Sequence, residues 1–291
     1  MTGLTRFLSG VGALLAGATL VALVTLLAWA WVRLTGPLLR FLPLARRVRY
    51  ASEPVPAAWR AIVERNVPLV LRLPHEARER LLRLAQVFVR DVPMEGLSGL
   101  DLTDEMKVTI AAQACLLVLN LRYPWFPTLR RVLVYPETFA PERVLFWHDS
   151  GIQRPPMPTA GEAWGHGTVI LAWDNVRLSS AGAADGYNVV LHEFAHILDS
   201  EDGVMGGVPL LEPPSSPRTW DRVLAETFER QRRLVEEGRE ALLRDYGSTN
   251  RAEFFAVATE AFFEQPAHLK TAAPEWYEEL RKFYRQDPAA W

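Results

Sequence analysis

Cysteine is almost absent from this 291-residue sequence, which contains Cys115 and no other. A single thiol excludes an intramolecular disulfide framework and any zinc site built from several cysteines. Cys115 lies in an apolar run, and nothing near it in the sequence would lower its pKa. We therefore interpret it as a small buried side chain rather than as a nucleophile.

Acidic residues are missing from the first fifty positions, which carry six arginines. The rest of the chain holds the other 26 basic side chains and all 34 acidic ones, a net charge of −8. This negative charge of residues 51–291 argues against a direct nucleic-acid partner, because phosphates are bound by clustered basic side chains. The ordinary composition, 49% apolar, excludes a disordered or collagen-like chain, and the length allows one ample core.

Charge is also missing from residues 7–32, a stretch of 26 residues that predicts a transmembrane helix. About 20 apolar residues in a helix span the hydrocarbon core of a bilayer. Trp29 and Trp31 lie at the far end, where aromatic rings favour the membrane interface. Five arginines follow the stretch and one precedes it, so the positive-inside rule places the C-terminal side in the cytoplasm.

A cleaved signal peptide is the alternative, because Ala28-Trp29-Ala30 fits a cleavage site. The apolar stretch is longer than a typical signal peptide requires, and its basic residues lie on the wrong side. We therefore expect a single-pass protein of the inner (cytoplasmic) membrane. Residues 33–56 would form a basic juxtamembrane connector that its prolines keep from being one continuous helix.

Residues 57–291 are expected to form one domain of class α+β, mostly helical with a small β-sheet. The spacing of apolar residues predicts six helices, at 57–66, 76–91, 103–121, 187–199, 218–243 and 251–264. Two short β-branched segments, 131–135 and 168–173, are typical of strands. Stretches rich in glycine and proline, 150–167 and 201–217, are expected to be loops.

The strongest chemical signal is the pentapeptide His-Glu-Phe-Ala-His at 192–196. On the predicted helix, His192 and His196 are four residues apart, so both imidazoles project from one face and can bind one zinc ion. Glu193 can reach a metal-bound water as general base. A helix with two hydrogen-bonded histidines is the alternative.

A catalytic zinc ion needs a third protein ligand and an open position for water. The helix predicted at 251–264 carries Glu253 and Glu260, seven residues apart and so nearly on one face. Acids among phenylalanines are costly to bury without a cation, so either is a candidate, although exposed acids on an amphipathic helix would give the same pattern. Asp199, three residues after His196, is better placed to orient a ligand than to bind zinc. The remaining histidines offer no obvious ligand spacing: His75, His148, His166 and His268.

Two segments carry a family resemblance: LHEFAHILD at 191–199 and YGSTNRAEFF at 246–255. Together they resemble the peptidase domain of anthrax lethal factor and, more closely, the Mlc titration factor A (MtfA) family of bacterial zinc peptidases. The similarity to MtfA covers most of residues 55–270. It implies a zincin-like, gluzincin-type fold with one zinc ion per chain. It also implies site roles: His192, His196 and Glu253 as zinc ligands, Glu193 as general base and Tyr246 as a donor to the developing oxyanion.

The resemblance also bears on partners. The best-known members of the family lack a membrane span and bind the repressor Mlc, so a transcriptional repressor joins a peptide or protein substrate among the expected partners. The leading hypothesis is a membrane-anchored zinc metallopeptidase with a regulatory role. The alternatives are a peptidase-like binding protein that sequesters a regulator, with catalysis incidental, and a zinc hydrolase acting on another bond. An intramembrane protease is disfavoured, because the zinc motif lies far from the span.

Overall fold

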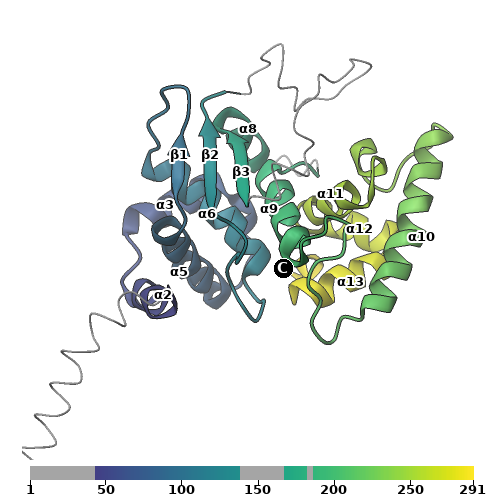
Figure 1. Cartoon of the computed structure of the whole chain (residues 1–291), viewed down its shortest axis with the longest axis horizontal. Helices are drawn as coiled ribbons and strands as arrows, with labels where there is room; N and C mark the ends of the chain where they lie inside the picture. The colour runs from purple at the N-terminus through teal and green to yellow at the C-terminus, as the bar shows by residue number, and fades with distance from the viewer. Residues whose placement is uncertain (1–42, 138–166, 182–185) are drawn as a thin grey trace, which may run out of the picture. The chain divides into compact units, whose positions relative to one another are not determined.

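The computed structural model describes residues 43–137, 167–181 and 186–291 (Figure 1). The chain divides into two compact units, Met1–Glu53 and Pro54–Trp291. Among the helices that the structure describes, none has both the length and the apolar character needed to cross a membrane. The span predicted at 7–32 lies outside the described residues, and so do His148, His166 and nearly all of the loop predicted at 150–167.

The described part of the first unit is one short helix, α2 (Pro43–Ser52). The sequence pattern does not predict this helix, because the prolines of residues 33–56 argue only against one continuous helix. These prolines mark the ends of α2 instead of breaking it, since Pro43 stands at its first position and Pro54 follows it. Proline is tolerated in the first turn of a helix, where its missing N–H has no partner to lose.

The N-terminal part of the second unit contains four helices, with one short strand between the third and the fourth. They are α3 (Ala57–Asn66), α4 (Pro68–Leu71), α5 (His75–Asp91) and α6 (Asp104–Val118). Helix α6 is buried at every position from Val108 to Val118, Cys115 included, and burial raises the pKa of that thiol far above its usual range. Thr103 caps α6 by accepting the Met106 N–H, as its position before two acids predicts. The cysteine is therefore a core side chain, as expected.

The sheet has three parallel strands in the order β1-β2-β3. Strands β2 (Arg131–Tyr135) and β3 (Thr168–Ala172) confirm the two predicted strands, and buried Val132 and Val134 alternate with more exposed residues along β2. Strand β1 (Met94–Gly96) was missed, because three residues are too few to show an alternating pattern. Helix α8 (Trp173–Ser180) follows β3 directly.

Helix α9 (Val189–Asp199) lies at the centre of the second unit and contacts α6, α11 and β3 (Figure 1). It begins two residues later than predicted, because Asn188 is its N-cap: the Asn188 side chain accepts the Leu191 N–H at 3.1 Å. Nine of its eleven residues are buried. A helix this enclosed holds its side chains in fixed positions.

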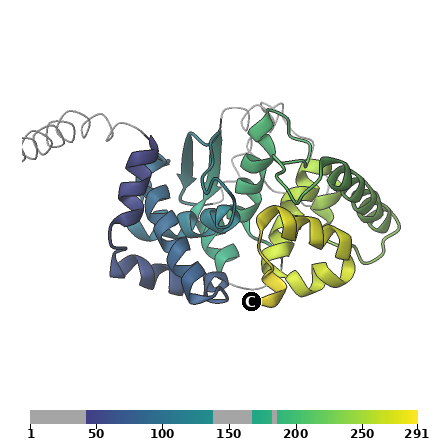
Figure 2. The same ribbon diagram turned by 90° about the horizontal axis from the view of Figure 1, so that it is seen from below.

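The C-terminal part is helical. It comprises the short 3₁₀ turns η1 (Ser200–Asp202), η2 (Asp245–Ser248) and η3 (Pro288–Ala290) and the helices α10 (Pro217–Glu236), α11 (Arg251–Glu264), α12 (Pro266–Ala272) and α13 (Pro274–Tyr284). The bounds predicted for α11 are confirmed. The helix predicted to reach residue 243 instead ends at Glu236, where Gly238 turns the chain back at φ 64°. Figures 1 and 2 place the sheet, α3 and α5 at one end of this unit and α10 and α13 at the other, with α9 between.

Candidate metal centre

The two histidines of the predicted zinc motif lie on the buried face of α9. His192 is 8% exposed and His196 is 2% exposed. Their rings are nearly perpendicular, with centroids 4.8 Å apart and planes inclined at 81°. The Nε2 atoms point toward each other across 3.2 Å, which is the arrangement expected of side chains four residues apart on one helical face.

Glu253 approaches the same two nitrogens from the first turn of α11. Asn250 caps that helix by accepting the Glu253 N–H at 3.0 Å, which fixes where the helix starts and therefore where Glu253 stands. The Glu253 Oε2 atom lies 3.1 Å from Nε2 of His192 and 3.3 Å from Nε2 of His196. One carboxylate oxygen and two imidazole nitrogens thus form a nearly equilateral triangle.

The size of this triangle fits a zinc ion. Bond lengths of about 2.0–2.1 Å in tetrahedral geometry separate neighbouring ligand atoms by about 3.3–3.4 Å. The three separations in the structure are 3.1, 3.2 and 3.3 Å. Two histidines and one glutamate are also a known ligand set of catalytic zinc, which leaves the fourth position for water or substrate. His192, His196 and Glu253 are therefore a group that can hold one metal ion.

The charges within the triangle are coupled. Burial lowers the pKa of His192, but its hydrogen bonds with Glu253 and Glu260 outweigh burial and raise that pKa to about 10. Burial opposes ionisation of Glu253, yet the two histidines hold the pKa of that carboxyl well below its usual range. Burial lowers the pKa of His196. Without metal, these opposite shifts favour a protonated His192 beside an ionised Glu253 near neutral pH.

Glu193 keeps part of its surface accessible beside the triangle. Burial raises the pKa of its carboxyl to about 8; the charge of His192 opposes this shift, whereas those of Glu253 and Glu260 add to it. A carboxyl group that exchanges its proton near neutral pH is suited to general acid–base chemistry.

Tyr246 is brought to the site by η2, the turn that precedes α11. Its ring centroid lies 5.8 Å from that of His192, with the planes inclined at 36°. The structure therefore gathers all five residues of the expected site: His192, Glu193, His196, Tyr246 and Glu253.

Glu260 and Asp199 do not take the positions that the sequence suggested for them. Glu260 is fully buried, so the alternative of an exposed acid is wrong. Its Oε1 atom lies 2.8 Å from Nδ1 of His192, whereas the triangle includes Nε2 of that residue. Glu260 therefore stands behind His192, a candidate metal ligand, in the place that the sequence suggested for Asp199. Asp199 instead accepts the Gly207 N–H at 2.9 Å and fastens the loop that follows α9.

Arg244 is a further residue of the site, and no motif in the sequence pointed to it. Its Nη2 atom donates to Oε1 of Glu260 at 2.6 Å, although sixteen residues separate the two. The signal available in the sequence was indirect. An acid inside the apolar helix at 251–264 requires a cationic partner if it is buried, and Arg244 stands two residues before Tyr246.

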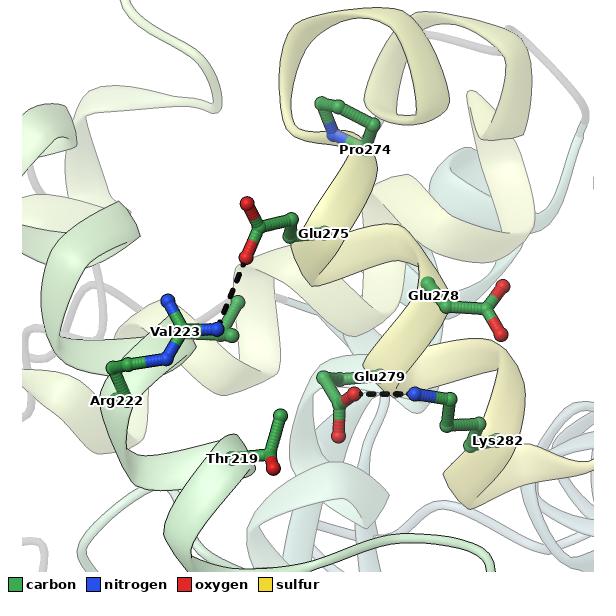
Figure 3. Close-up of a pocket in the computed structure, with 8 residues that line it drawn as sticks. All are labelled: Thr219, Arg222, Val223, Pro274, Glu275, Glu278, Glu279 and Lys282. Atoms are coloured by element: carbon green, nitrogen blue, oxygen red, sulfur yellow. Dashed lines mark hydrogen bonds and ion pairs between the residues drawn. The ribbon is translucent and has the colours of Figure 1, made fainter.

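The other described histidines lie elsewhere. His75 has a side chain that is 83% exposed, and His268 bonds the Leu242 carbonyl through Nε2 at 3.2 Å. A hollow also opens between α10 and α13 (Figure 3), where Arg222 pairs with Glu275 at 3.2 Å and Lys282 with Glu279 at 2.7 Å. Because these charged side chains are already paired with one another, the hollow is a weaker candidate for a functional site than the group of His192, His196 and Glu253.

Comparison with known proteins agrees with this geometry. Residues 42–285 match the family described as Glucose-regulated metallo-peptidase M90. An uncharacterized protein of Synechocystis sp. is 34% identical over 244 residues, which cover 84% of this chain and 89% of the relative. Mlc titration factor A of Pectobacterium atrosepticum is 33% identical over 80% of this chain and 87% of its own length. The protein of the same name from Serratia proteamaculans is 32% identical over 77% of this chain and 86% of its own length. The resemblance expected from the motifs is thus confirmed over most of the chain.

Proposed function

Because the chain belongs to the Glucose-regulated metallo-peptidase M90 family, we propose that it is a zinc-dependent peptidase that hydrolyses peptide bonds with an activated water. One observation carries the proposal. The triangle of His192, His196 and Glu253 has the dimensions of a tetrahedral zinc site, and Glu193, whose pKa lies near neutrality, stands beside it. A purely structural zinc site would instead use four protein ligands.

In the proposed reaction, Glu193 and Tyr246 have separate roles. Zinc, when bound, supplies a Lewis acid that acidifies water and polarises the peptide carbonyl. Glu193 takes the proton of the attacking water and later gives it to the leaving amine. The Tyr246 hydroxyl donates a hydrogen bond to the oxyanion that develops on the carbonyl oxygen, which is worth a few kcal/mol in typical cases.

The sheet offers a place to align the substrate. In the described part of the chain β3 is the last strand of the sheet, and it contacts α9, which carries the histidines. An extended peptide could add beside β3 through main-chain hydrogen bonds. The inner side chains of β3, Val169 and Leu171, are buried, as an ordinary core strand also requires.

We also propose that the chain is anchored in a membrane. The uncharged stretch at 7–32 supports a single membrane anchor, and the arginines after it support a cytoplasmic catalytic domain. A reporter that is active only after export, fused behind Trp291, should be inactive; activity would overturn this orientation.

The names of the relatives favour a second candidate function, binding of an Mlc-like transcriptional repressor with catalysis incidental. Purified Mlc repressor would be the probe, presented to the parent chain and to Glu193→Gln. Equal binding by both, with the repressor left intact and no peptide cleaved by the parent, would favour this candidate over the peptidase.

The test of the peptidase is metal content together with hydrolysis. The purified full-length chain should contain one zinc per chain by mass spectrometry and should cleave members of a fluorogenic peptide library. Glu253→Ala should lose both zinc and cleavage. Glu193→Gln should keep zinc and lose cleavage, because it changes the base and not a ligand. A parent chain that binds no zinc after reconstitution, or equal cleavage by Glu193→Gln, would contradict the proposal.

A further inference from the structure

Glu260 is an unusual residue for its surroundings. It is 0% exposed and lies in α11 among phenylalanines that are themselves buried. An isolated ionised carboxylate in such a place is very costly, so its charge has to be balanced by partners. Three donors surround it.

The two oxygens of Glu260 are divided among these donors. Oε1 receives the Arg244 Nη2–H at 2.6 Å and faces Nδ1 of His192 at 2.8 Å. Oε2 receives the backbone N–H of Asn188, the N-cap of α9, at 2.6 Å. One carboxylate thus joins α11 to both the start of α9 and its first metal-binding histidine.

The consequence for His192 follows from imidazole chemistry. A metal ligand must present an unprotonated nitrogen, and a hydrogen bond from the other nitrogen decides which one that is. Nδ1 of His192 faces Glu260, while Nε2 faces Glu253 and His196. When Nδ1–H donates to Glu260, Nε2 is directed into the triangle.

Arg244 extends this network toward Tyr246. Its Nε donates to the Gly186 carbonyl at 3.3 Å, and its guanidinium lies 4.7 Å from the ring centroid of Tyr187. The arginine is therefore held from several sides, and its chain position is two residues before Tyr246. Fixing Arg244 on Glu260 restricts where the turn that carries Tyr246 can lie.

We propose that Glu260 is a positioning residue that holds His192 for metal binding, and that Arg244 anchors the Tyr246 turn to the same carboxylate. The proposal deepens the proposed function, since it rests on the same zinc site. It assigns two tasks to the ion pair between buried Glu260 and half-buried Arg244: the orientation of a ligand and the placement of the oxyanion donor.

Zinc affinity tests the first task without any need for catalysis. The full-length chain is stripped of metal, and zinc binding is measured in competition with a chromophoric chelator. Glu260→Ala should weaken zinc binding about 10- to 100-fold, as loss of such outer partners commonly does. Glu260→Gln keeps an acceptor for Nδ1–H but loses the charge, so its loss should be smaller, about 3- to 10-fold.

Glu264 provides the matched control. It is also buried, lies one helical turn further along α11 and accepts the Asn188 Nδ2–H at 3.0 Å. Glu264→Ala should therefore perturb the same helix but change zinc affinity less than about threefold. Circular dichroism establishes that each variant is folded, and if Glu260→Ala does not fold, Glu260→Gln takes its place. Parent-like zinc affinity in a folded Glu260 variant, or an equal loss in Glu264→Ala, would overturn the proposal.

The second task has a spectroscopic and a kinetic test. With Co²⁺ in place of zinc, Glu260→Gln should shift the visible ligand-field bands, and Arg244→Met should shift them less, because Glu260 still faces Nδ1 of His192 in that variant. Arg244→Met should lower kcat, and it should do so much less when Tyr246 is already phenylalanine, because the two residues act through one hydroxyl. Independent, multiplicative losses would overturn the role given to Arg244. If no peptide is cleaved but zinc affinity falls as stated, the positioning role of Glu260 stands and the peptidase proposal fails.

Discussion

The ring of Tyr246 lies 5.8 Å from the ring of His192, although 54 positions separate the two residues along the chain. Tyr246 belongs to the turn before α11 and His192 to the first half of α9. The packing of these two elements thus brings the Tyr246 phenol beside the imidazole of a candidate metal ligand, as its proposed role as oxyanion donor requires.

Tyr246→Phe should therefore lower kcat by about 100-fold, which is the usual loss when one oxyanion donor is removed. KM should change little, because the hydroxyl would act mainly in the transition state. Steady-state kinetics on a cleaved peptide measures both constants. Tyr123→Phe, which changes a tyrosine that is 53% exposed, is the control. A rise in KM at constant kcat would make Tyr246 a ground-state contact.

Glu193→Gln should stabilise the metal-free protein in a pH-dependent way. The folded state raises the pKa of Glu193 from its ordinary 4.5 to about 8, so the unfolded chain releases this proton at a lower pH than the folded chain does. The carboxyl therefore costs stability progressively as the pH rises from about 4.5 to 8. Glu193→Gln removes that cost at pH 8 and has little effect at pH 5.

Thermal unfolding in the presence of a chelator measures this difference. At pH 8 the Tm of Glu193→Gln should exceed that of the parent by roughly 2–8 °C, which corresponds to one or two kcal/mol in a domain of this size. Glu240→Gln changes an exposed glutamate and should leave Tm unchanged at both pH values. The same increase at pH 5 as at pH 8 would show that ionisation of Glu193 is not its cause.

Zinc binding should release a proton from His192. Its pKa of about 10 in the metal-free site means that Nε2 is protonated at neutral pH and has to lose that proton before it can bind a metal. Apparent zinc affinity should therefore rise about tenfold per pH unit between pH 6 and 8. Titration calorimetry in buffers of different ionisation enthalpy counts the protons. His268→Gln, which changes a histidine outside the site, should not alter the count, and a pH-independent affinity would contradict the prediction.

Gly207→Ala should destabilise the protein more than Gly203→Ala does. Both glycines have positive φ, 76° and 88°, so both substitutions carry backbone strain of about 1–2 kcal/mol. A Cβ at Gly207 would also lie 2.5 Å from the Arg251 carbonyl oxygen, whereas nothing lies within 4 Å of one at Gly203.

Tm should fall by roughly 2–8 °C in Gly203→Ala and by clearly more in Gly207→Ala. Arg251 begins α11 two residues before Glu253, so Gly207→Ala should weaken zinc binding as well. Equal effects of the two substitutions on Tm, measured by calorimetry, would contradict this account of the loop.

Patterns among neighbouring residues were enough to predict several local features of this protein. Apolar spacing located α11 with its observed bounds and placed His192 and His196 on one face of α9, because helical periodicity depends only on neighbours along the chain. The β-branched segments marked β2 and β3 for the same reason. The family motifs pointed to Glu253, Glu193 and Tyr246, which the structure gathers around the two histidines.

The different positions of the two acids of α11 depend instead on how the helices pack against one another. Glu253 and Glu260 stand nearly on one face and are about 10.5 Å apart along the axis, so periodicity treats them alike. The crossing of α9 and α11 places the His192 ring between them, with Nε2 toward Glu253 and Nδ1 toward Glu260. Likewise, the pairing of Arg244 with Glu260 and of Asp199 with Gly207 depends on which segments fold back against each other. Such contacts depend on how the chain folds back on itself, and a pattern of neighbouring residues cannot encode them.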